Sequence, residues 1–152
     1  MTYLVSYQKH IDSITIKQLN LHAPGSTEAV GQEIATVDGT TYVAMPDGST
    51  LPENQPTEIA ISIINPVVVT AALREQIKLN SPQCKLISSR MVEKIREKYS
   101  LEDEQYFARI GVGVALGAYT FQPGEQEALL AFGTFIESIR QWGKSERSNL
   151  GL

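Results

Sequence analysis

The chain has 152 residues, a net charge of −4 and a sequence pI of 5.2. A chain of this length can fold as one domain without disulfides or a metal, and its one cysteine, Cys84, has no intrachain partner. The acidic pI disfavours a nucleic-acid partner, because DNA-binding domains concentrate Lys and Arg on one face. No apolar segment reaches membrane-spanning length and no signal peptide is visible, so we expect cytoplasmic synthesis and no membrane contact.

The first third of the sequence predicts strands. An approximate alternation of apolar residues over 11–21 predicts a half-buried strand. Asp38-Gly39 and Pro46-Asp47-Gly48 lie between β-branched and aromatic residues, and they predict a three-strand meander over 33–51, because Asp-Gly supplies the positive φ of tight hairpin turns. Alternating isoleucines over 58–64 predict one more strand.

Three helix starts follow. Asn65-Pro66 is a good N-cap followed by proline at the first helical position, and it predicts a short helix over 67–79. Ser81-Pro82 repeats this signal before a helix over 83–99, which carries one apolar stripe. Ser100 with Asp103 predicts a capping box at the start of a third helix.

The last predicted helix begins after Pro123 and carries an apolar stripe with intervals of three and four residues. Its members are Ala128, Leu129, Phe132, Phe135, Ile136, Ile139 and Trp142. Gly143 is predicted to end this helix. The remaining residues, 144–152, read as a polar C-terminal tail that is mobile in isolation.

Residues 110–124 contain no charge, and the flanking charges are Arg109 and Glu125. This stretch is predicted to form the buried centre of the fold. Its spacing favours a helix over the alternative of a strand, although three glycines inside a helix would cost about 1 kcal/mol each. We interpret the glycines as packing positions and not as a nucleotide loop, because a capped helix and not a strand precedes them.

Cys84 is the one residue with a chemical case. As the third residue of a helix, next to Lys85, its thiol would have a lowered pKa, and His10 or His22 could act as its base. A small buried core residue is the favoured interpretation. The two histidines have no metal-ligand spacing, so the sequence assigns no catalytic residue, metal or cofactor.

Strands followed by helices predict an α+β fold, in which an N-terminal antiparallel sheet or meander is followed by three or four packed helices. We expect one globular domain over 1–143, mainly β over 1–64 and mainly α over 65–143, and then the tail.

This pattern favours a non-enzymatic structural or assembly subunit whose partners are protein subunits, either copies of itself or other proteins. A bacteriophage particle, as a capsid, connector or tail component, is the expected setting, and the chain would then reside in the virion. The candidate interaction surface consists of Phe135, Ile139, Trp142, Lys144, Arg147 and Leu150. The first alternative is a small homodimeric regulatory or ligand-binding domain, and the second is a cysteine-dependent enzyme that uses Cys84.

Overall fold

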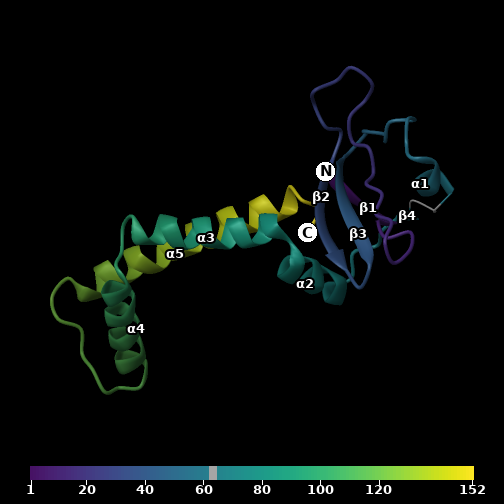
Figure 1. The fold of residues 1–152 in the computed structure, drawn as a ribbon. Coiled ribbons are helices and arrows are strands. Elements are labelled where there is room, and N and C mark those ends of the chain that lie inside the picture. The colour runs from purple at the N-terminus through teal and green to yellow at the C-terminus, as the bar shows by residue number, and fades with distance from the viewer. Residues whose placement is uncertain (62–64) are drawn as a thin grey trace. The chain divides into compact units, whose positions relative to one another are not determined.

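A computed structural model describes residues 1–61 and 65–152. Its elements are β1 (Thr2–Gln8), β2 (Gln32–Val37), β3 (Thr40–Pro46), α1 (Thr57–Ile61), β4 (Asn65–Pro66), α2 (Ala71–Asn80), α3 (Pro82–Arg96), α4 (Leu101–Ala115) and α5 (Glu125–Ser148) (Figure 1). An antiparallel sheet followed by helices confirms the α+β prediction.

The chain divides into two compact units, which we describe one at a time. Unit 1 comprises Met1–Leu86 together with Glu146–Leu152, and unit 2 comprises Ile87–Ser145. This division differs from the expected one, in which a single domain over 1–143 is followed by a tail. Residues 146–152 belong to the unit that holds the sheet.

The sheet of unit 1 has the strand order β2-β3-β1-β4. The predicted hairpin is confirmed, because β2 and β3 pair antiparallel around Asp38 and Gly39, whose φ angles are 49° and 81°. The predicted third strand after Gly48 is wrong. Its place beside β3 is taken by β1, which pairs antiparallel with β3 along its whole length.

The predicted strands over 11–21 and 58–64 are also wrong. Both were predicted from an alternation of apolar residues, which does not supply a pairing partner. Residues 11–21 form a loop that holds a single bridge, between His10 and Ile16. In the predicted strand over 58–64, residues 58–61 are helical and belong to α1, where Ile59 is fully buried, and residues 62–64 lie outside the described part of the chain.

The helix predicted after Asn65-Pro66 begins later. Asn65 and Pro66 form β4 and pair with Ser6 and Val5 of β1. The N-cap of α2 is Thr70, whose side chain accepts a hydrogen bond from the Leu73 amide at 3.2 Å. The three valines at 67–69 favour extended backbone, which delays the helix by several residues.

Both faces of the sheet are covered, because successive strand residues point to opposite sides. One cluster consists of Val5, Tyr7, Leu19, Val43, Met45 and Ile59. The other consists of Leu4, Ile34, Ala35, Ala44 and Ile77, with Leu73, Leu150 and Leu152 packed against it. A β-bulge between Glu33 and Ala35 lets Ile34 and Ala35 join the same cluster, while Glu33 pairs with Val43 of the other one.

The predicted tail is structured. Helix α5 continues past Gly143 to Ser148, and Leu150 and Leu152 then pack against the second cluster. The Thr2 hydroxyl donates a hydrogen bond to the Asn149 carbonyl at 3.0 Å. Gly151 adopts a φ of 79°, and a Cβ there would lie 3.1 Å from a methyl group of Leu4. Glycine therefore fits both the turn and the close approach to β1.

Unit 2 is held by aromatic packing between helices. Tyr99 meets Phe107 and Phe132 edge-on, at centroid distances of 6.0 and 5.0 Å, and Phe107 stacks on Phe132 at 4.8 Å. The predicted capping box of Ser100 and Asp103 is present at the start of α4. Gly143 is buried and does not end α5, because a Cβ at this position would collide with the Met91 side chain.

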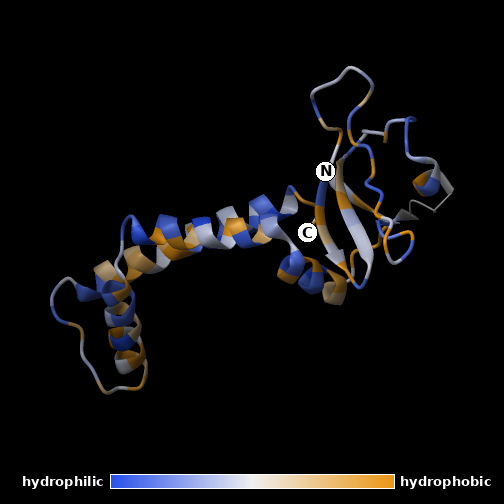
Figure 2. Cartoon of the chain, in the orientation of Figure 1, coloured by the Kyte–Doolittle hydropathy of each residue, from blue (hydrophilic) through white to orange (hydrophobic). Residues whose placement is uncertain are grey.

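The uncharged stretch 110–124 is helical as far as Ala115, which confirms the helix over the strand in that part, and Gly117 follows with a φ of 70°. The prediction of a buried centre is wrong. Ile110 is 2% exposed, but Val112 is 58% and Leu116 is 77% exposed. Figure 2 shows hydrophobic residues near the end of α4 and the start of α5.

Candidate functional site

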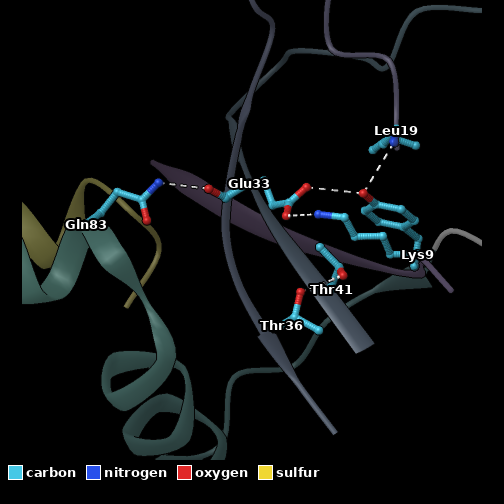
Figure 3. A network of polar contacts seen from close by, with 7 residues as sticks. Lys9, Leu19, Glu33, Thr36, Thr41 and Gln83 are labelled. Atoms are coloured by element: carbon cyan, nitrogen blue, oxygen red, sulfur yellow. Dashed lines mark hydrogen bonds and ion pairs between the residues drawn. The ribbon is translucent and has the colours of Figure 1, made fainter. Parts of the chain in front are cut away.

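A polar network of unit 1 surrounds Glu33 (Figure 3). Its carboxylate accepts hydrogen bonds from the Lys9 ammonium at 2.8 Å and from the Tyr7 hydroxyl at 3.3 Å. The Gln83 side-chain amide donates to the Glu33 carbonyl at 2.8 Å. The network therefore ties β1, β2 and the start of α3 together.

Tyr7 is the buried member of this network, at 2% exposed. Its hydroxyl accepts a hydrogen bond from the Leu19 amide at 3.3 Å while it donates to Glu33. Burial, with the nearby Glu33 carboxylate, raises the pKa of Tyr7 to about 12. The phenol stays protonated at neutral pH, so its role here is to hold the loop after β1 onto the sheet.

The residues singled out for chemistry do not form a reactive group. Cys84 is 3% exposed, and its amide donates to the Ser81 hydroxyl at 3.3 Å, as the predicted N-cap requires. Burial keeps this thiol away from solvent. His10 and His22 are exposed and lie in two separate backbone bridges, with Ile16 and Ala29 respectively.

The six residues of the predicted interaction surface lie in different environments, some packed within the chain and some exposed. Ile139 is 8% exposed, Phe135 lies 5.4 Å from Tyr99 in the aromatic cluster, and Leu150 packs on the sheet. Trp142 is partly covered by Lys94, whose ammonium lies 4.9 Å from its ring. Lys144 is exposed and Arg147 half-buried. The apolar members are thus engaged within this chain.

A second polar network fixes the loop between α4 and α5. The Glu125 carboxylate accepts hydrogen bonds from the Tyr119 hydroxyl at 2.6 Å, from the Gln122 amide at 2.6 Å and from the Tyr106 hydroxyl. These bonds lower the pKa of Glu125, and the bond to Glu125 raises the pKa of Tyr119 to about 12. These bonds tie the loop to α4 and to the start of α5.

Gly113 lets this loop approach α4, since a Cβ there would lie 2.8 Å from the Tyr119 Cβ, whereas a Cβ at Gly133 would meet nothing within 4 Å. We expect Gly113→Ala to lower the free energy of unfolding by about 1–3 kcal/mol through overpacking. The matched variant Gly133→Ala should raise it by about 0.5–1 kcal/mol. Urea unfolding followed by fluorescence of Trp142, the single tryptophan, measures both changes. Equal gains from the two variants would contradict the steric role of Gly113.

Three apolar side chains near the loop between α4 and α5 are largely exposed: Val112, Leu116 and Leu130, which we call together the apolar hairpin end. Leu130 is 64% exposed, comparable to the other two. Beside it lies a shallow depression of about 540 Å³, the α5 groove, which is lined by Leu129, Leu130, Gly133, Thr134 and Glu137. Exposed apolar side chains beside a depression are typical of sites that another molecule covers.

Two further hollows lie in unit 1, both beside β2. The larger has a volume of about 420 Å³, and the residues that line it include Thr2, Gly31, Ala44 and Asn149. The smaller, of about 320 Å³, lies between residues 33–36 and the corner of α2 and α3 at Asn80 and Pro82. The residues that line the larger hollow carry no charge, and Glu33 is the charged residue in the lining of the smaller one.

Over residues 1–61 and 65–152, no three His, Cys, Asp or Glu side chains gather closely enough to hold a metal ion. No helix among those residues has the length and apolarity needed to cross a membrane. The apolar hairpin end and the α5 groove are the candidate functional surfaces of unit 2. No protein-family model, curated protein or solved structure matches this chain.

Proposed function

We propose that this protein is a non-enzymatic assembly subunit that associates with copies of itself through unit 2. The observation that carries the proposal is the apolar hairpin end, where Val112, Leu116 and Leu130 are 58%, 77% and 64% exposed. The hydrogen bonds to Glu125 tie the neighbouring loop to the start of α5, and an ordered segment loses less entropy on association than a mobile one.

The test is the native mass by light scattering over a concentration series. We expect a mass above one subunit that rises with concentration in the wild-type protein. Leu116→Glu should lower it, because a charge would be buried in the contact. The control Leu79→Glu changes a leucine of α2 that is 72% exposed and should leave the mass unchanged. A wild-type monomer at every concentration would refute self-assembly.

The setting we propose is a bacteriophage particle, with the chain as a capsid, connector or tail component. A particle of this kind repeats one small chain many times, and each copy needs fixed contact surfaces. The apolar hairpin end is such a surface. Mass spectrometry of purified particles tests this narrower proposal, which requires peptides of this chain in stoichiometric amounts.

A further inference from the structure

Residues 9–17 form a tight loop, which we call the isoleucine loop. The Lys17 amide donates to the Lys9 carbonyl at 2.9 Å, and the Ile11 amide donates to the Thr15 carbonyl at 3.0 Å. At the tip, the Asp12 carboxylate accepts hydrogen bonds from the Ile14 amide, the Thr15 amide and the Thr15 hydroxyl at 2.9, 2.7 and 3.0 Å. These bonds lower the pKa of Asp12, so the turn persists at neutral pH.

This ordered loop exposes three isoleucines. Ile14 at the tip is 89% exposed, Ile16 is 54% and Ile11 is 40% exposed. The Lys9–Glu33 ion pair and the Leu19–Tyr7 hydrogen bond fix the base of the loop to the sheet. The loop thus presents three exposed isoleucines on a hydrogen-bonded turn, and a segment that is already ordered loses little entropy when another surface covers it.

The α5 groove offers an apolar hollow for such a projection. Leu129 and Leu130 give it an apolar lining, and Gly133 leaves open space where another residue would place a side chain. Its volume of about 540 Å³ leaves room for an apolar side chain.

The charges beside the two surfaces are also complementary. Lys17 is the last residue of the isoleucine loop and pairs with Glu58 at 3.5 Å, with about 40% of each side chain exposed. Glu137 flanks the groove, is 54% exposed and pairs with Arg140 at 3.6 Å. Pairs this long and this exposed contribute little, so either residue can exchange its partner. A loop that enters the groove would bring a lysine to a glutamate.

We propose that the isoleucine loop of one copy docks into the α5 groove of a second copy, head to tail. The proposal rests on the self-assembly proposed above and names its contact. Because the loop and the groove are different surfaces of one chain, each docked pair keeps one free groove on one copy and one free loop on the other. Such a heterologous contact continues until a ring closes or a filament forms.

The test uses one loop variant, Ile14→Asp, and one groove variant, Leu130→Asp. Both positions are exposed, at 89% and 64%, so neither change is expected to unfold the chain. Each variant alone should weaken self-association by roughly tenfold or more, the loss that follows from burying a charge in place of an apolar side chain. Sedimentation velocity of the full chain at matched concentrations measures this loss.

The decisive sample is an equimolar mixture of the two variants. Ile14→Asp retains an intact groove and Leu130→Asp retains an intact loop, so the mixture should form a dimer that does not grow. Gly133→Leu fills the groove without adding charge. A mixture of Ile14→Asp with Gly133→Leu should therefore also form a dimer that does not grow. Leu79→Asp, another exposed leucine, is the control and should assemble like the wild type.

Three outcomes would overturn the inference. Two variants that stay monomeric both alone and mixed would show that loop and groove do not bind each other. An Ile14→Asp variant that assembles like the wild type would remove the loop from the contact and leave the self-assembly proposal standing. A wild-type chain that is monomeric at every concentration would refute both proposals together.

Discussion

Replacing Leu150 and Leu152 by alanine is expected to lower the free energy of unfolding by about 2–5 kcal/mol. Both leucines pack against the cluster formed by Leu4, Ile34, Ala35, Ala44 and Ile77, of which Leu4, Ile34 and Ile77 are at most 1% exposed. Their removal would leave space beside β1 that the surrounding strands cannot close, because a sheet residue cannot move without its pairing partners.

The matched control is the double variant Leu116→Ala, Leu130→Ala, which removes two leucines that are 77% and 64% exposed. It should change the free energy of unfolding by less than about 0.5 kcal/mol. Urea unfolding below the association range, followed by hydrogen exchange of the β1 and β3 amides, measures both variants. A similar small loss in the two double variants would show that residues 149–152 behave as a tail after all.

Tyr7→Phe is expected to cost about 1–3 kcal/mol, because it leaves the Leu19 amide without its acceptor in a buried place. The control is Tyr3→Phe. Tyr3 is 37% exposed and its hydroxyl donates to the Ser49 carbonyl at 2.9 Å. Water can replace that bond, so the loss should be about 1 kcal/mol or less.

The difference in stability between the wild type and Tyr7→Phe should depend on pH. The pKa of Tyr7 is about 12 in the folded chain and 10.0 as the ordinary value, so between these values the unfolded chain has lost the proton and the folded chain retains it. The contribution of Tyr7 to the free energy of unfolding is therefore fully present below pH 10. It falls by roughly 1–3 kcal/mol as the pH rises toward 12. Wild type and Tyr7→Phe should converge in stability over this range. Parallel curves would contradict the prediction.

Local signals that satisfy backbone groups could be predicted from the sequence. Asp38-Gly39 forms its hairpin turn, and Ser100 with Asp103 forms its capping box. The Ser81 cap of α3 is also present. Each of these features depends on residues that are neighbours along the chain, so no distant partner has to be known.

Features that need a distant partner could not be predicted. The apolar alternation over 11–21 is typical of a strand, but Ile14 and Ile16 face solvent, and among the described residues no strand pairs with this segment. Residues 2–8 form β1. They include β-branched and aromatic residues that favour a strand, but the predicted strands do not include them. Gly143 looks like a helix stop in isolation and is a packing position beside Met91.

The candidate surfaces followed the same rule. The apolar stripe of α5 pointed to Phe135, Ile139 and Trp142, but within the chain this stripe faces other helices. The uncharged stretch at 110–124 was interpreted as buried, and it supplies exposed apolar residues instead. Hydrophobicity alone marks a residue for burial, and it does not say whether the same chain or another one covers it.

The composition of unit 1 from two separate segments bears on how the protein is made. Residues 146–152 leave the ribosome after all of unit 2, yet they pack against strands that were synthesised first. Translation is vectorial, so the second apolar cluster of the nascent sheet stays partly uncovered while some sixty further residues are added. During that interval the nascent chain exposes apolar side chains that the finished protein covers.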